Sequence, residues 1–174
     1  PPPPKGANVV NLYTQEYFQL IHDRLAKGGM TSYWLPHHSL AEGDARTIVR
    51  AFCEVFEDSS LWLGSGENWL LLGVKDGHQK VSAERFREQW SNKVVGPIIR
   101  ASGFETPEQL GAYFICGREE MLELTKDTLP LVDNFPHRLS PSSSARNGES
   151  RYRELLDATQ SRERFLASDH IRRL

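Results

Sequence analysis

Asn11-Leu12-Tyr13-Thr14-Gln15-Glu16-Tyr17-Phe18 and Gly28-Gly29-Met30-Thr31-Ser32-Tyr33-Trp34-Leu35-Pro36 are the two stretches that decide the expected fold. Thr14 is a good N-cap residue, because its hydroxyl accepts a hydrogen bond from a free amide of the first helical turn. The glycine pair gives the helix a left-handed exit, and the apolar run that follows reads as a short buried strand ending at Pro36. The pattern predicts one helix–strand unit of a parallel, doubly wound α/β sheet.

The length is enough for one domain with a substantial core, or for one domain plus an arm. The chain has 174 residues, of which 39% are hydrophobic, and its net charge is −2. Such a balance gives no electrostatic case for binding nucleic acid or an anionic membrane. The sequence has no secretory segment and no apolar run that would cross a bilayer. We therefore expect a cytoplasmic protein with no nucleic-acid partner and no membrane segment in this chain.

The two cysteines are expected to be structural. Cys53 and Cys116 are far apart in sequence, and each lies within a helical pattern. Buried, reduced thiols of a cytoplasmic protein fit this placement, and no Cys/His spacing suggests a metal ligand set. His37 and His38 are adjacent, so on a strand they would point to opposite faces and could not share one ion. We expect no metal site.

A second helix and a hairpin follow the opening unit. Ser39 and Glu42 have capping-box spacing, and an apolar stripe continues from Ala45 to Phe56. Two apolar runs, 61–63 and 69–74, are joined by five turn-forming residues and predict an antiparallel hairpin.

The strand signal ends near Asp76-Gly77. We expect helices at 82–92, 107–115 and 118–126, the second of them opened by a capping box at Thr106. The predicted division of the chain is an α/β part, a helical extension, a linker and a C-terminal helical arm, with the bounds 1–76, 77–140, 141–148 and 149–174.

The two opening stretches resemble the spermidine synthase-like family, the polyamine aminopropyltransferases. These proteins carry a Leu-Tyr-Thr-x-Glu-Phe-Tyr helix start and a Gly-Gly-x-x-x-x-Trp-Leu-Pro strand. The resemblance covers residues 7–75 well and residues 105–140 weakly. It implies the C-terminal half of a Rossmann-like methyltransferase sheet, in which parallel strands are followed by an antiparallel terminal hairpin, together with an α-helical extension. The Trp-Leu-Pro version is typical of longer relatives, which are often membrane-fused.

The resemblance also indicates what this chain lacks. In the family, the glycine-rich cofactor loop and the catalytic acid lie upstream of the Leu-Tyr-Thr motif. In this chain the corresponding window reads Pro1-Pro2-Pro3-Pro4-Lys5, without an acid. A carboxylate is needed there to accept the proton of the attacking amine. We therefore expect a fragment without catalytic residues, whose main partner is the missing N-terminal half of the domain.

The activity implied by the resemblance is transfer of an aminopropyl or other alkyl group to an amine. The full-length protein would bind decarboxylated S-adenosylmethionine or S-adenosylmethionine, with a polyamine or other amine as acceptor; the isolated chain is expected to bind neither cofactor. By alignment with the motif, the cofactor-binding candidates are Asn8 and Val9, whose backbone would cup the adenine, and Leu12, which would line that pocket. The substrate-binding candidates are Trp34 and His38.

Structural interpretations stand beside each of these assignments. Leu12 also fits a core plug, Trp34 a buried strand tryptophan, and His38 a solvent-facing loop residue. Asp133-Asn134-Phe135-Pro136 resembles a degenerate Thr-Asp-Asp-x-Pro segment or, alternatively, a turn that docks the helical extension. The alternative for the whole chain is a noncatalytic scaffold whose extension, from Glu149 onward, mediates homo-oligomerisation or docking. A third possibility is a methyltransferase relative that acts on another acceptor.

Overall fold

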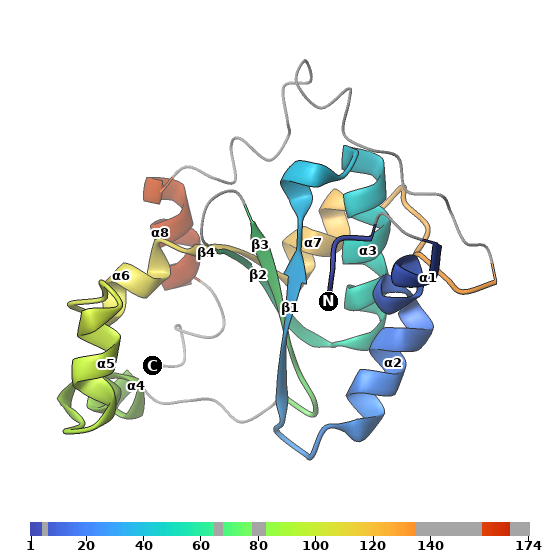
Figure 1. Ribbon diagram of the computed structural model, residues 1–174. Helices are drawn as coiled ribbons and strands as arrows, with labels where there is room; N and C mark the ends of the chain where they lie inside the picture. Colours follow the sequence, from blue (N-terminus) through green and yellow to red (C-terminus); the bar gives the residue numbers. More distant parts are fainter. Residues whose placement is uncertain (5–6, 65–67, 78–82, 135–157, 168–174) are drawn as a thin grey trace.

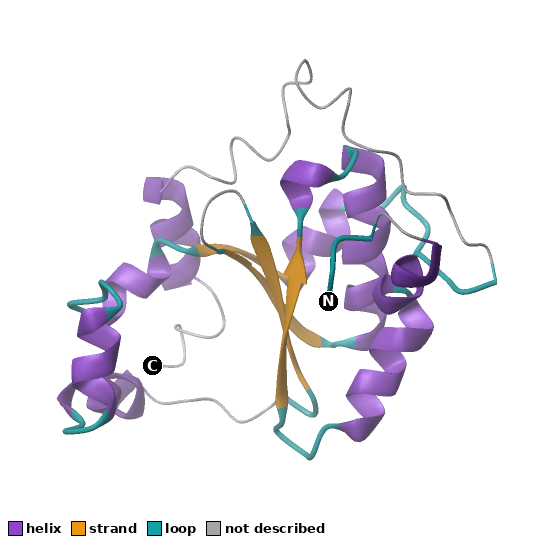
Figure 2. Ribbon diagram, viewed as in Figure 1, coloured by secondary structure: helices purple, strands orange, loops and turns teal. Residues whose placement is uncertain are grey.

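The computed structural model describes residues 1–4, 7–64, 68–77, 83–134 and 158–167. These residues form a four-stranded sheet with helices on both sides (Figures 1 and 2). None of the described helices is long and apolar enough to cross a membrane.

The sheet is antiparallel throughout. Its strands occur in the order β1-β3-β2-β4, and every neighbouring pair is antiparallel. The pairing of β1 with β3 and of β2 with β3 is regular, whereas the β2–β4 register shifts between Leu61 and Trp62. The strands are β1 (Met30–Leu35), β2 (Asp58–Leu63), β3 (Trp69–Val74) and β4 (Phe114–Gly117).

The expected parallel, Rossmann-like sheet is therefore wrong. β1 and β2 run in the same direction, but β3 lies between them and is antiparallel to both, so the two never pair with each other. The hairpin prediction for β2 and β3 is confirmed. β4 corrects a further expectation: the helix expected at 107–115 ends at Gly111, and residues 114 and 115 lie in an edge strand together with Cys116, which is expected in a helical pattern. Helix–strand periodicity indicates which residues form strands, but it does not specify which strands are neighbours.

Helices α2, α3 and α7 lie on one side of the sheet, and α8 contacts β4 from the other side (Figure 1). The bounds are α1 (Ala7–Val10), η1 (Asn11–Tyr13), α2 (Gln15–Arg24), η2 (His37–Ser39), α3 (Glu42–Val55), α4 (Ala83–Ser91), α5 (Val95–Ala101), α6 (Pro107–Gly111), α7 (Arg118–Leu124) and α8 (Ala158–Ala167).

Two of the three predicted helix starts follow local chemistry. Thr14 caps α2 as predicted, since its hydroxyl accepts the Tyr17 N–H at 3.4 Å. The capping box at Thr106 is also formed. The box predicted at Ser39 is not: Ser39 belongs to η2, its hydroxyl donates to the Pro36 carbonyl, and α3 begins at Glu42.

The core lies between the sheet and the helices α2 and α3. Three aromatic side chains connect these layers: the ring of Phe18 lies 5.0 Å from that of Tyr33 and 5.1 Å from that of Phe52. Along β3 the side chains alternate between buried and half-buried, as expected for a strand with one face against a core. The fully buried side chains on this face include Leu35, Leu61, Trp69 and Leu71.

The described part of the C-terminal arm packs against the sheet. Phe165 of α8 lies 5.7 Å from the ring of Phe114 and 6.0 Å from that of Trp62. The Arg164 Nε donates to the Ile115 carbonyl at 2.8 Å, which fixes α8 to β4. The predicted linker, 141–148, lies outside the described residues, as do residues 149–157 and 168–174 of the predicted arm.

Candidate functional site

The candidate cofactor segment lies against the end of β1. Asn8 and Val9 belong to the short helix α1, and Leu12 belongs to η1. Val9 and Leu12 are packed against the hydrophobic core. The Leu12 carbonyl accepts a hydrogen bond from the Tyr33 hydroxyl, which ties this segment to β1. The placement of Leu12 agrees with the structural interpretation, in which its side chain packs against the core. Its backbone carbonyl already accepts the hydrogen bond from Tyr33.

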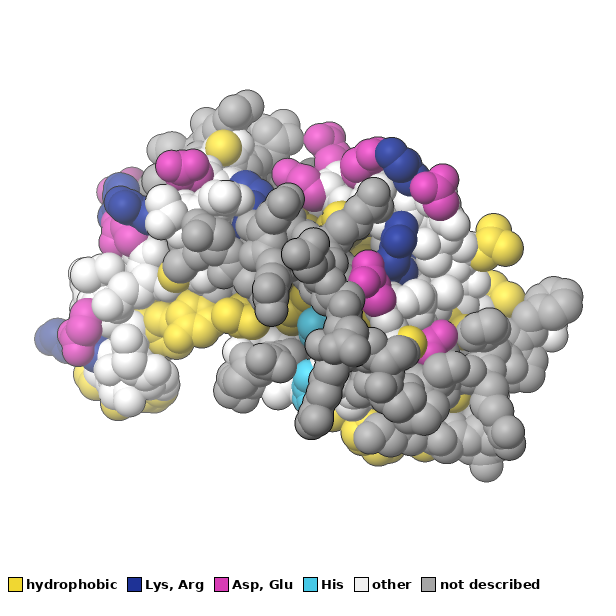
Figure 3. All heavy atoms as spheres, turned by 90° about the horizontal axis from the view of Figure 1, so that it is seen from above, with side chains coloured by type: hydrophobic (Ala, Val, Ile, Leu, Met, Phe, Trp, Pro, Cys, Tyr) yellow, Lys and Arg dark blue, Asp and Glu magenta, His cyan; other side chains and the backbone are white. Residues whose placement is uncertain are grey.

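The candidate substrate residues lie where β1 ends. Trp34 is half-buried, and its Nε1 donates to the Asn68 Oδ1 at 2.9 Å. His38 is exposed in η2, which begins directly after Pro36. His37 instead stacks on Trp69, with ring centroids 3.9 Å apart and planes inclined by 19°. Figure 3, seen from above, shows histidine side chains beside hydrophobic ones at this end of the molecule.

The two sets of candidates are distant in sequence, and the structure brings them to the same strand but on opposite faces of β1. Tyr33, which bonds to Leu12, points toward the helices α2 and α3. Successive side chains of a strand point to opposite faces, so Trp34 points away from those helices. The described residues therefore do not place Leu12 and Trp34 in one shared cavity. The η1 segment lies on one face of β1 near its end, and Trp34 lies on the other face.

Two tyrosines that sequence reasoning did not single out hold this end together. Tyr13 is fully buried, and its hydroxyl donates to the Pro2 carbonyl at 3.0 Å. Burial raises the pKa of both Tyr13 and Tyr33 well above the ordinary value of a phenol. Both hydroxyls therefore stay protonated and act as hydrogen-bond donors that position the segment. The only feature of the sequence that could have identified Tyr13 and Tyr33 is that they are aromatic residues at positions expected to face the core.

The segment from Leu131 to Asp133 is hydrogen-bonded to the N-terminal halves of both α2 and α3. The Leu131 N–H donates to the Thr47 carbonyl at 3.1 Å, and the Leu131 carbonyl accepts from Gln15 N–H at 2.8 Å. The Asp133 N–H donates to the Glu16 carboxylate at 3.0 Å. These bonds agree with the docking interpretation of this segment; Phe135 and Pro136 lie outside the described residues.

Within the described part of the chain, no group of three or more His, Cys, Asp or Glu side chains is arranged to hold a metal ion. Both cysteines are buried and reduced, and the Cys53 Sγ lies 3.9 Å from the Met121 Sδ. Burial raises the pKa of Cys53 to about 11 and raises that of Cys116 still further.

These shifts predict a pH-dependent stability. A thiol has a pKa of about 8.5 in the unfolded chain. Because the two thiols keep their protons to higher pH in the folded state than in the unfolded chain, the free energy of unfolding should fall as the pH rises from about 9 toward 11. Thiol titration with a disulfide reagent at pH 8 should likewise be slow in the folded chain and fast in denaturant. Rapid labelling of both thiols in the folded chain would contradict this expectation.

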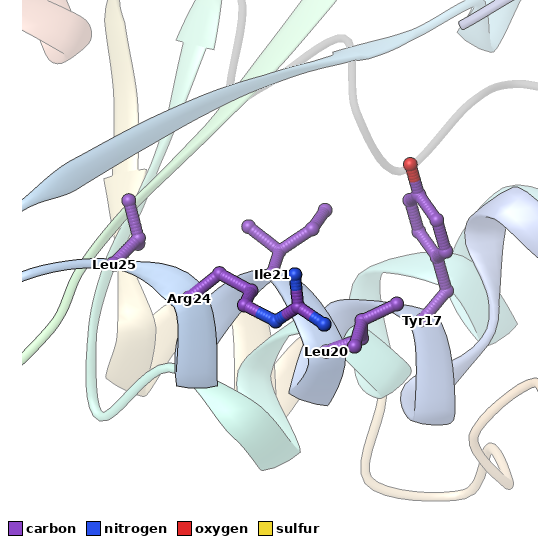
Figure 4. Close-up of a pocket in the computed structure, with 5 residues that line it drawn as sticks. All are labelled: Tyr17, Leu20, Ile21, Arg24 and Leu25. Atoms are coloured by element: carbon purple, nitrogen blue, oxygen red, sulfur yellow. The ribbon is translucent and has the colours of Figure 1, made fainter.

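A shallow depression lies beside α2. It has a volume of about 320 Å³ and is lined by Tyr17, Leu20, Ile21, Arg24 and Leu25. Figure 4 shows these side chains rising from α2 and the turn after it. The lining is apolar except for Arg24, and Leu20 is 49% exposed. None of the candidate residues from the sequence lies in this depression.

No family model, no curated protein and no solved structure matches this chain.

Proposed function

We propose that this chain is part of a spermidine synthase-like, adenosyl-sulfonium-dependent transferase that moves an alkyl group, such as aminopropyl, to an amine. The observation that carries the proposal is the hydrogen bond from the Tyr33 hydroxyl to the Leu12 carbonyl. It joins the candidate cofactor segment to β1, which bears Trp34 and is followed by η2 with His38. In this proposal, decarboxylated S-adenosylmethionine or S-adenosylmethionine binds only when a partner polypeptide supplies the cofactor loop and the catalytic acid.

Titration with methylthioadenosine, the product nucleoside of aminopropyl transfer, tests this proposal. We expect the isolated chain to show no saturable binding in the micromolar range, because only one wall of the adenosine site would be present. Addition of the N-terminal half of the parent protein should produce binding, and Leu12→Asp in this chain should abolish it. Micromolar binding by the isolated chain would contradict the expected division of the site.

A noncatalytic interaction module is the second candidate. The favouring observation is that Leu20 of α2 is 49% exposed and lines a depression together with the apolar side chains of Ile21 and Leu25. Exposed apolar side chains that cluster on one surface are typical of protein–protein contacts. Under this candidate the sheet is a scaffold, and the size of the isolated chain in solution becomes the informative measurement.

A further inference from the structure

β1 is an edge strand of the described sheet. It pairs with β3 on one side, and no described strand lies on the other (Figure 1). Residues 30–35 contain no charge and no proline, and their register with β3 is unbroken. Charges, prolines and bulges are the devices that usually prevent edge pairing. The opposite edge differs, because β4 is only four residues long, adjoins a bulge and is contacted by α8.

The hydrogen-bonding pattern identifies which backbone groups point outward. The Lys75 N–H donates to the Gly29 carbonyl at 2.9 Å, so these residues form a hydrogen-bonded pair at the end of the β1–β3 ladder. Such pairs alternate along antiparallel strands. Thr31 and the odd-numbered residues after it therefore bond to β3, whereas Met30, Ser32 and Trp34 direct their N–H and C=O groups outward. An added strand must pair with these three residues.

The outer surface of α2 carries a self-complementary stripe. Glu16, Leu20 and Arg24 follow one another at intervals of four residues and lie on one helical face. All three side chains are exposed. In an antiparallel second copy centred on Leu20, Glu16 would lie opposite Arg24 of that copy, and the two leucines would meet. A parallel copy would instead place like charges opposite each other.

The neighbouring groups leave this stripe available. Asp23, beside Arg24, is engaged by the Gln19 Nε2 at 2.8 Å. One Glu16 oxygen accepts from Asp133 N–H at 3.0 Å, and its carboxylate remains exposed. The depression of Figure 4 continues the apolar surface from Leu20 to Ile21 and Leu25.

We propose that two copies of this chain associate about a two-fold axis, with β1 paired edge to edge in antiparallel register and the α2 stripes in contact. The outward residues fix the register: Ser32 lies opposite Ser32 of the second copy, and Met30 lies opposite Trp34 of the second copy. Met30 is thereby covered by an indole. The two antiparallel sheets become one continuous sheet. This inference rests on the second candidate function and names the partner as the chain itself.

Sedimentation equilibrium of the full chain tests the association. We expect a mass twice that of the 19.8 kDa chain at micromolar concentrations. Ser32→Pro should give a monomer with an unchanged far-ultraviolet spectrum, because proline removes an outward N–H and leaves the ladder to β3 intact. The matched control is Thr31→Pro, which removes a ladder N–H and should destabilise the fold itself.

A charge exchange provides a test that does not alter the strand. Glu16→Arg should raise the dimer dissociation constant about tenfold or more, because it places two arginines opposite each other. Adding Arg24→Glu to the same chain recreates opposite pairs and should restore the wild-type dissociation constant. A wild-type chain that stays monomeric, or a dimer that neither Ser32→Pro nor Glu16→Arg weakens, would overturn the proposal.

A peptide of residues 29–36 separates this inference from the candidate function on which it rests. If the chain is monomeric yet binds the peptide, the second copy is the wrong partner and the edge of β1 is still an interaction surface. If the chain is monomeric and binds no peptide, both ideas fail. The methylthioadenosine titration concerns the transferase proposal and is unaffected by either result.

Discussion

Replacing Phe52 by alanine is expected to lower the free energy of unfolding by about 3–5 kcal/mol. Phe52 is fully buried in α3, and its ring lies 5.1 Å from that of Phe18 and 4.7 Å from that of Phe56. It therefore connects α2, α3 and the sheet. Truncation to alanine removes the apolar surface that the Phe52 ring buries, and it leaves a cavity that the two neighbouring rings cannot fill. Domain stabilities are about 5–15 kcal/mol, so the loss is a large fraction of the total.

Urea unfolding followed by tryptophan fluorescence measures this effect. Leu129→Ala is the matched control, because Leu129 is 83% exposed and its truncation should change the free energy of unfolding by less than about 0.5 kcal/mol. Equal effects of Phe52→Ala and Leu129→Ala would contradict the placement of the core between α3 and the sheet.

Replacing Gly73 by alanine is expected to cost about 1–3 kcal/mol, since the new methyl group overpacks the core. A Cβ at this position would lie 2.5 Å from Phe56 Cγ and 2.9 Å from Phe52 Cζ. The two phenylalanine rings are stacked on each other and cannot both move aside without loss of contact. Gly73 is thus required by the close approach of α3 to β3.

Gly43→Ala is the control for this substitution. Gly43 lies in α3, and a Cβ there would meet no atom within 4 Å. Alanine favours a helix more than glycine does, so this variant should be unchanged or more stable by up to about 1 kcal/mol. The same chemical change is therefore expected to have opposite signs at the two positions. Thermal unfolding of both variants checks this contrast, and destabilisation by Gly43→Ala equal to that by Gly73→Ala would contradict it.

The candidate site could be located from the sequence only in part. The Trp34 indole and exposed His38 lie at the end of β1, where the strand was expected to end. Leu12 was recognised as a residue that faces inward, but its bond to Tyr33 spans 21 residues and has no local signal. The stacking of His37 on Trp69 was also missed, because β1 and β3 are separated by α3 and β2 in the sequence.

The sequence by itself determined the helices and strands wherever their chemistry is local. The Thr14 cap, the apolar stripe of α3 and the turn residues between β2 and β3 each act within a few residues, so spacing is sufficient to predict them. The buried state of both cysteines was also predicted, from their isolated positions within helical patterns, although Cys116 lies in β4.

Only the tertiary structure decided the order of the strands. β3 lies between β1 and β2, and this placement turns an expected parallel sheet into an antiparallel one. β4 joins the edge from a segment whose local pattern favours a helix. The physical reason is that strand neighbours are selected by the free energy of burying whole faces against α2, α3 and α8, which depends on side chains distant in sequence.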